Sequence, residues 1–276
     1  MIFDRNRFIK IVKRYSYFRD SIDWDNFRKE VLAIKEIDLQ IVNNFLRKID
    51  KHSFVVKITK NKRKKKGATR TPKIIIKSIS KDIGFLKLPG FFTLDSKQYI
   101  KNYEDIVYSL NKLRNKKKLI LDLSKNTGGN MYPWLAALAP LYDTECVGYF
   151  DYKYKKTKDK WLIKKDGIYC GRKKWFRKIN NNRFSFEKIA IWVSSQTSSS
   201  GEAIAISFCG QKNVKIFGQK TANFTTGNED FKNGEVAIWL NTCLMQDRKQ
   251  KNYTNGISPD VITKTPIEDI GKWLNS

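Results

Sequence analysis

An apolar run that passes through a serine-rich turn constrains the fold of this chain more than any other feature. Residues 189–193 are apolar and mostly β-branched, which predicts a short buried strand. Residues 203–208 carry apolar side chains at helical spacing, and Gly210 supplies a stop signal. The serines at 198–200 are therefore expected on a strand-to-helix turn. A hydroxyl at such a turn lies beside free backbone N–H groups and the positive end of a helix dipole.

Two interpretations fit Ser199 in this turn. Its surroundings suit an attacking serine, because the N–H groups and the dipole stabilise a developing oxyanion. The same residue and Glu202 also fit a capping box, in which the two side chains satisfy free N–H groups of the helix. Caps are far more common than nucleophiles, so this stretch alone favours capping.

Length and composition predict a globular protein. The 276 residues suffice for one large or two small domains, and 41% of them are hydrophobic. The four cysteines show no paired spacing, so they indicate neither a zinc site nor a disulfide framework. We expect reduced thiols, and neither a metal nor a cofactor.

The net charge of +28 predicts affinity for anionic partners such as nucleic acid, anionic lipid or acidic polymers. Lys, Asn and Ile are all abundant, as A/T-rich codons would produce, and this favours charge spread over the surface. A dedicated nucleic-acid site stays open as an alternative. Its best location is residues 143–187, where aromatic side chains alternate with Lys and Arg.

No part of the sequence predicts a membrane-spanning helix or a signal peptide. A spanning helix needs about 20 apolar residues, and no run approaches this length. Residues 1–7 lack an uninterrupted apolar core. The sequence as written predicts a cytoplasmic protein, or an exported one if its N-terminus was trimmed.

The chain divides into three parts by pattern. Residues 1–58 predict a helical N-terminal subdomain of three helices, and 59–73 form a basic loop rich in Lys with Gly, Thr and Pro. Residues 74–276 alternate strand and helix signals, which favours an α/β core. Strands are expected at 74–76, 83–88, 119–123, 214–218 and 236–240, helices at 100–113 and 133–138, loops and strands at 143–187, and a long loop at 219–228.

Two further features carry potential chemistry. His52 is the only histidine, so it is the only imidazole available as a proton acceptor near neutral pH, although a lone histidine is more often structural. Gly128 and Gly129 follow a predicted strand and precede a predicted helix, where their N–H groups can point at one anion. Any tight turn between a strand and a helix could use the same glycine pair.

Together, these features resemble the tail-specific, or C-terminal processing, serine peptidase family S41, particularly its tricorn-like branch. The resemblance covers about residues 23–261 and implies a helical N-terminal part beside an α/β catalytic core similar to the Clp protease and crotonase folds. It rests on four segments that occur in the order of that family, namely 50–54, 121–129, 197–202 with Gly218, and 256–260.

The resemblance also implies roles for individual residues. The nucleophile falls on Ser199, and the base of the tricorn-like branch falls on His52. The oxyanion donors fall on the backbone amides of Gly128, Gly129 and Ser200. Because the sole histidine occupies the position that this branch requires, catalysis becomes the favoured interpretation of Ser199.

The chain departs from the pattern of the family in several places. Processing members carry a lysine base where this chain has residues 223–225, although Lys220 keeps a Ser/Lys variant open. Residues 252–255 occupy the place of the acidic partner of the histidine. Asp247 is the nearest upstream carboxylate, so the orienting role falls to it or to an amide. Ser124 replaces the usual arginine, and no PDZ-like segment fits between His52 and the next strands.

The sequence therefore predicts a serine peptidase that hydrolyses peptide bonds and favours substrates with acidic residues or free carboxylates. One alternative is a non-catalytic relative that binds peptides, which the missing acidic partner motivates. The other is a basic nucleic-acid-binding protein.

Overall fold

The computed structural model describes residues 2–58, 73–93 and 95–276 and divides into two compact units. The first unit comprises Met1–Thr69, Asp151–Lys158 and Thr226–Leu244, and the second comprises Arg70–Phe150, Asp159–Thr225 and Met245–Ser276. The basic loop expected at 59–73 lies outside the described residues, except for Lys73.

Helices at the N-terminus of the first unit confirm the pattern expected there. They are α1 (Arg5–Tyr15), the short 3₁₀ helix η1 (Arg19–Ser21), α2 (Trp24–Ala33) and α3 (Leu39–Ile49). The side chains of Asp4, Asp23 and Asp38 accept hydrogen bonds from the first turns of the three α-helices, so aspartate caps define where these helices begin.

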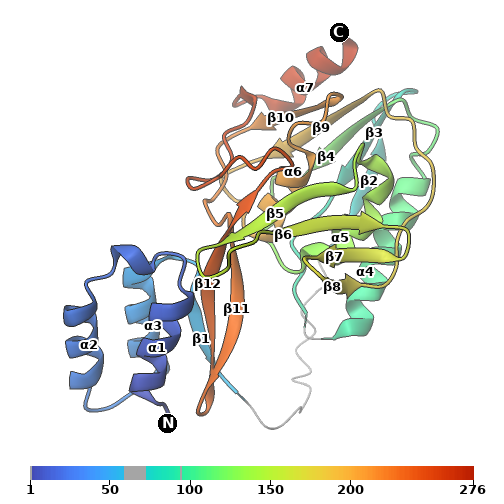
Figure 1. Cartoon of the computed structure of the whole chain (residues 1–276). Helices are drawn as coiled ribbons and strands as arrows, with labels where there is room; N and C mark the ends of the chain where they lie inside the picture. Colours follow the sequence, from blue (N-terminus) through green and yellow to red (C-terminus); the bar gives the residue numbers. More distant parts are fainter. Residues whose placement is uncertain (1, 59–72, 94) are drawn as a thin grey trace. The chain divides into compact units, whose positions relative to one another are not determined.

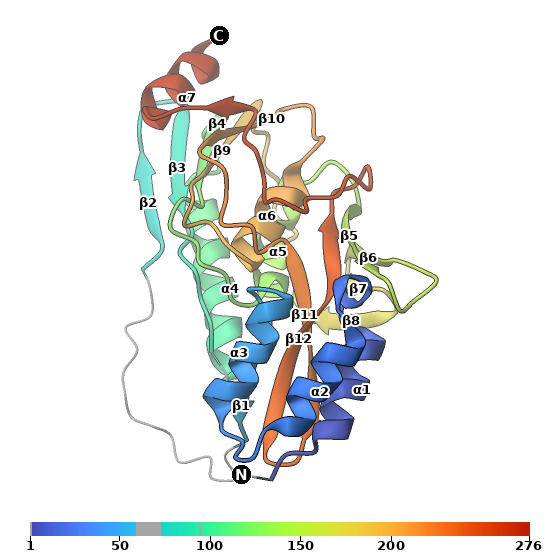
Figure 2. The same cartoon turned by 90° about the vertical axis from the view of Figure 1, so that its left-hand side faces the viewer.

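The same unit contains β1 (Phe54–Lys57), β11 (Thr226–Asn233) and β12 (Val236–Gln246), and β12 pairs antiparallel with both of the others. The helices pack their apolar faces against this ladder (Figure 2). The expectation of a loop at 219–228 and a strand at 236–240 was partly wrong, because β11 begins at Thr226 and β12 continues to Gln246. The core includes Phe8, Val12, Val31, Leu46, Val55, Ile238 and Leu240.

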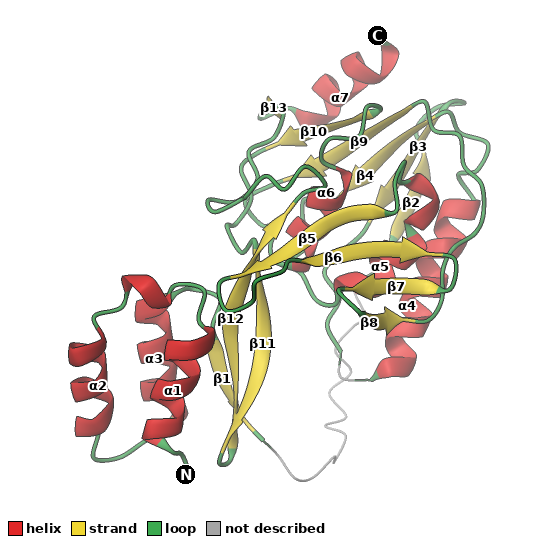
Figure 3. Ribbon diagram, in the orientation of Figure 1, coloured by secondary structure: helices red, strands yellow, loops and turns green. Residues whose placement is uncertain are grey.

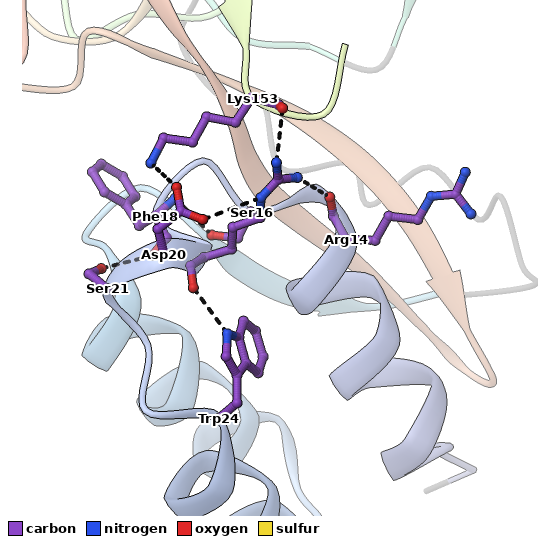
Figure 4. A network of polar contacts seen from close by, with 8 residues as sticks. Arg14, Ser16, Phe18, Asp20, Ser21, Trp24 and Lys153 are labelled. Carbon is purple, nitrogen blue, oxygen red and sulfur yellow. Dashed lines mark hydrogen bonds and ion pairs between the residues drawn. The ribbon is translucent and has the colours of Figure 1, made fainter.

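A polar network joins residues 151–158 to the first helices (Figure 4). The Arg19 guanidinium donates to the carbonyl oxygens of Arg14 and Lys153 at 2.7 and 2.9 Å. Lys153 forms an ion pair with Asp20 at 2.7 Å, and Trp24 Nε1 donates to the Arg19 carbonyl. These contacts fix a segment that follows α1 by more than a hundred residues in the sequence.

The described residues of the second unit form a six-stranded sheet in the order β13-β10-β9-β4-β3-β2 (Figure 1). Neighbouring strands from β13 to β3 are parallel, and β2 pairs antiparallel at the edge. The strands are β2 (Ile75–Ser78), β3 (Ile83–Lys87), β4 (Lys118–Asp122), β9 (Lys188–Val193), β10 (Val214–Gly218) and β13 (Val261–Ile262).

Helices cover both faces of this sheet. The helix α7 (Pro266–Asn275) packs Ile270 and Leu274 against Phe85, Ile120 and Phe217 on one face. The other face meets α4 (Ser96–Asn111), α5 (Met131–Ala137) and α6 (Ser200–Phe208), and the short helix η2 (Ala139–Leu141) follows α5. The mixed α/β fold expected from the sequence is confirmed.

The aromatic and basic region at 143–187 is more regular than the sequence indicated (Figure 3). It contains β5 (Cys146–Tyr152), β6 (Asp159–Lys164), β7 (Gly167–Cys170) and β8 (Lys173–Phe176), which pair antiparallel in succession. Phe150 and Trp161 are buried and their rings contact each other, so these aromatics serve packing.

Neither a membrane-spanning helix nor a metal site is found among the described residues. No helix in these ranges is long and apolar enough to cross a bilayer. No group of three or more His, Cys, Asp or Glu side chains in the same ranges is arranged to hold a metal ion.

Candidate active site

The candidate residues of the second unit lie where parallel strands end. The strand β4 leads into the Gly128–Gly129 turn before α5, and β9 leads into the serine turn before α6. Carboxyl ends of parallel strands meet at one edge of a sheet, which is where α/β proteins commonly bind ligands. Hydrogen bonds from Ser194 Oγ to the Ser124 carbonyl (2.5 Å) and from Thr197 Oγ1 to the Leu123 carbonyl (2.8 Å) join the two turns.

Ser199 has an unusual backbone conformation at the N-terminus of α6. Its φ is 52° and its ψ is −119°, whereas N-cap residues normally have extended backbone, as Asp4 and Asp95 have here. A positive φ at a residue other than glycine is strained, and such strain clusters at functional sites. Glu202 accepts the Ser199 N–H at 2.9 Å, as in a capping box, but capping alone does not require this conformation.

Glu202 has a wider role than the cap expected from the sequence. Its buried carboxylate accepts the N–H groups of Ser199, Asn223 and Phe224 at 2.9, 3.1 and 2.8 Å, and it also accepts the Thr221 hydroxyl. Burial raises the pKa of this carboxyl group, and the hydrogen bonds oppose that effect. Glu202 therefore fixes both the serine turn and the chain at 221–224. In the sequence, this role of Glu202 is indicated only by its being the single charged residue of the helix.

The glycine turn lies directly against the serine turn. Gly128 and Gly129 have φ values of 98° and 140°, which favour glycine. A Cβ at Gly128 would lie 2.9 Å from Ser199 Cβ and 3.2 Å from the Ser200 backbone nitrogen. The Ser200 hydroxyl donates to the Gly129 carbonyl at 2.7 Å. The structure therefore brings together four of the residues predicted for the site, namely Gly128, Gly129, Ser199 and Ser200.

Backbone amides of these turns differ in their hydrogen bonding. The Gly128 N–H donates to Asn126 Oδ1 at 3.0 Å. Asn126, which the sequence analysis missed, is fully buried, and its side chain also donates to the Leu88 carbonyl at 3.1 Å. Within the described ranges, the N–H groups of Gly129 and Ser200 donate to no other residue. These two amides therefore remain able to hold an oxyanion.

His52 belongs to the first unit, in a loop that follows α3. The Asp50 carboxylate accepts the N–H groups of His52 and Ser53 at 2.8 and 2.7 Å and the Ser53 hydroxyl at 2.6 Å. From the ladder, Asn228 Nδ2 donates to the His52 carbonyl at 2.9 Å, and the Asn241 N–H donates to Ser53 Oγ at 2.8 Å. These hydrogen bonds fix the backbone of His52 and Ser53.

The His52 imidazole is largely buried and pairs with a hydroxyl. Its Nδ1 lies 2.6 Å from Thr226 Oγ1, at the start of β11. Burial lowers the pKa of His52 from 6.5 to about 4, so the ring is neutral near pH 7. Thr226 had no sequence signal, because the hydrogen bond joins residues 174 positions apart.

Asp247 and Lys220 are the two other candidates from the sequence. Asp247, in the second unit, is buried and accepts the N–H groups of Lys249 and Lys251 at 2.8 and 3.1 Å and the Tyr253 hydroxyl at 2.8 Å. Lys220, the alternative base, is exposed.

The chain is similar to proteins of known sequence and structure. The chain is 27% identical over 193 residues to the nisin-resistance protein of Lactococcus lactis subsp. lactis, and the match covers 69% of this chain and 59% of that protein. The chain thus spans less than two thirds of the length of this relative.

Solved structures share the fold over nearly the whole chain. A lipoprotein from Streptococcus agalactiae superimposes with a TM-score of 0.78 and 26% identity, covering 98% of this chain and 94% of that chain. The photosystem II D1 C-terminal processing protease has a TM-score of 0.61 and 13% identity, with coverages of 99% and 96%. The sequence model of peptidase family S41 matches residues 82–263, which is more than half of the chain. The chain therefore belongs to peptidase family S41.

Proposed function

We propose that this chain is a serine peptidase in which Ser199 attacks the peptide carbonyl and His52 accepts the proton of the serine hydroxyl. The observation that carries the proposal is the strained backbone of Ser199 at the N-terminus of α6, beside the amides of Gly129 and Ser200. A capping residue needs no such conformation, whereas a nucleophile gains from a turn that exposes its hydroxyl next to N–H donors.

The chemistry follows from these groups. As Ser199 Oγ bonds to the carbonyl carbon, His52 takes the hydroxyl proton and the carbonyl oxygen becomes an oxyanion. The Gly129 and Ser200 N–H groups donate to that oxygen, and each such donor is worth on the order of 3 kcal/mol. His52 then gives its proton to the leaving amine as the C–N bond breaks. Water then attacks the acyl-enzyme while His52 takes a proton from it, and His52 returns that proton to Ser199 Oγ as the bond between the acyl carbon and this oxygen breaks.

Each of the remaining residues supports one of these steps. Gly128, whose own N–H is held by Asn126, keeps the turn close to Ser199. Glu202 holds the Ser199 N–H and thereby the strained turn. Asn223 and Phe224 donate their N–H groups to the same carboxylate, which adds to the anchoring of the serine turn.

A neutral imidazole suits the base role in this scheme. A base must be unprotonated before it accepts a proton, and burial keeps His52 in that state at pH 7. The same burial destabilises the charged imidazolium that forms during the reaction, which raises the energy of that step. We therefore expect a slow peptidase with activity that extends into mildly acidic conditions.

We propose peptides as the substrates. The relative named for resistance to nisin makes nisin the first peptide to test. The charge of +28 adds a preference for peptides with acidic residues or a free carboxylate, because the field of the protein attracts them.

A peptide-cleavage assay tests the proposal. The purified protein is incubated with nisin and with a pool of acidic and neutral peptides, and the products are identified by mass spectrometry. Ser199→Ala and His52→Asn are expected to lower cleavage by at least a hundredfold, since each removes a reacting group. Ser198→Ala is the matched control, because its hydroxyl is in the same turn and has no role in the scheme.

Two results would contradict the proposal. Cleavage that survives Ser199→Ala would exclude this serine as the nucleophile. Binding of peptides without any cleavage would favour the non-catalytic alternative, in which the site is kept but the chemistry is lost.

A further inference from the structure

We propose that the Thr226 hydroxyl is the positioning partner of His52, in the place that a carboxylate holds in Ser-His-Asp sites. This inference rests on the proposed role of His52 as the base. It goes further by assigning the orienting role to a hydroxyl, so that the partner of the imidazole is neutral.

The imidazole of His52 and the hydroxyl of Thr226 are in close contact. The 2.6 Å separation between His52 Nδ1 and Thr226 Oγ1 is short for a hydrogen bond between a ring nitrogen and a hydroxyl. Thr226 is only 8% exposed, so water has little access to compete for its hydroxyl. As the first residue of β11, its backbone is fixed by pairing with Leu244 on β12. The hydroxyl therefore has a defined position from which it can orient the imidazole.

The chemistry of the ring gives this contact a function. A neutral imidazole carries its proton on one nitrogen, and only the other nitrogen can act as a base. When Nδ1–H donates to Thr226 Oγ1, the lone pair lies on Nε2, which becomes the basic nitrogen. When Nε2 then takes the serine proton, Nδ1 keeps its hydrogen bond to the same oxygen. The hydroxyl thus accepts from Nδ1 both before and after proton transfer.

Asp247 is the competing candidate from the sequence, and its carboxylate is already used elsewhere. It accepts two N–H groups of its own turn and the Tyr253 hydroxyl. The nearest carboxylate in the His52 loop is Asp50, and its oxygens bind the backbone of 52–53 and the Ser53 hydroxyl. Both acids have structural partners, whereas the Thr226 hydroxyl faces the ring.

A single histidine makes the test unusually direct. Protein labelled with ¹⁵N-histidine gives signals from only one imidazole, and the two nitrogen shifts report which nitrogen carries the proton. We compare the wild type with Thr226→Val, which removes the hydroxyl at nearly equal volume, and with Thr226→Ser, which restores it. Peptide cleavage, kcat and KM are measured on the same samples.

The matched control is Thr242→Val on β12. Thr242 is fully buried in the same unit, and its hydroxyl has no hydrogen-bond partner among the described residues. This substitution makes the same chemical change in the same ladder, at a hydroxyl that forms no hydrogen bond to His52. Asp247→Asn serves as a second arm, because it tests the competing carboxylate.

The wild type is expected to show Nδ1 protonated and Nε2 unprotonated at pH 7. In Thr226→Val the two nitrogen shifts should move toward a mixture of tautomers, and kcat should fall at least tenfold with KM changed less than twofold. Thr226→Ser should recover most of both. Thr242→Val and Asp247→Asn should leave the imidazole signals as in the wild type.

The results that would overturn the inference differ from those that would overturn the proposed function. Unchanged imidazole signals and kcat in Thr226→Val, or signals that move in Asp247→Asn alone, would exclude Thr226 as the partner. A wild type that cleaves no peptide would refute the proposed function, but the ¹⁵N shifts would still show whether Thr226 sets the tautomer.

Discussion

The low pKa of His52 predicts a specific dependence of stability on pH. Burial lowers this pKa from 6.5 to about 4, so between these values the unfolded chain binds a proton that the folded protein excludes. The free energy of unfolding should therefore fall as the pH falls through this interval. At about 1.4 kcal/mol per pKa unit, the loss amounts to about 3 kcal/mol, an upper value because the ring keeps some exposure.

Substitution of His52 by asparagine isolates this contribution. Asparagine places an amide nitrogen near the position of Nδ1, so the contact to Thr226 can persist without a titrating group. Buried carboxyl groups such as Asp50 and Glu202, whose pKa values are raised by burial, titrate in both proteins and cancel in the difference.

Urea unfolding at several pH values measures the difference. From about pH 7 to about pH 4, the wild type should lose about 3 kcal/mol more stability than His52→Asn. A difference that stays constant across this interval would refute the reasoning, because it would mean that the imidazole is not held neutral by burial.

Further predictions concern the two turns. Gly128→Ala should destabilise the protein by about 2 kcal/mol or more and abolish cleavage, because the added Cβ would lie 2.9 Å from Ser199 Cβ and the φ of 98° disfavours alanine. Thermal unfolding measures the loss of stability, and the peptide assay measures the loss of cleavage. Glu202→Gln should lower kcat at least tenfold, since an amide offers one acceptor oxygen where the carboxylate serves four donors; unchanged kinetics would contradict its anchoring role. Asn126→Ala should cost about 2 kcal/mol of stability in urea unfolding, because it leaves the Gly128 N–H and the Leu88 carbonyl unpaired; a stability equal to the wild type would argue against this contact.

Local apolar patterns made much of the fold predictable. The strand β9, the helix α6 and the N-terminal helices have apolar residues at regular spacing, and aspartates mark where the three N-terminal α-helices begin. These signals lie within a few residues of each other, so a single sequence reveals them.

Other elements depend on contacts that are distant in the sequence. The strand β11 is polar along most of its length and has no apolar alternation, so only its pairing with β12 makes it a strand. In the second half of β12, Asn241 and Thr242 are buried polar residues, which the apolar signal of 236–240 could not predict.

The candidate site shows the same division. Ser199, Gly128, Gly129 and His52 were identified from short motifs, because residue type and neighbours define each of them. Thr226 and Asn126 act through hydrogen bonds to partners that folding brings near, and their residue types are common in loops. No pattern in one sequence distinguishes such a threonine or asparagine from the many others in this chain.

Labelling with a fluorophosphonate probe tests the central claim most directly. The probe bonds covalently to a serine whose hydroxyl is activated by a base, and peptide mapping locates the modified residue. The account predicts that the wild type and Ser198→Ala are labelled on Ser199, and that Ser199→Ala is not labelled. Equal labelling of the wild type and Ser199→Ala would contradict it.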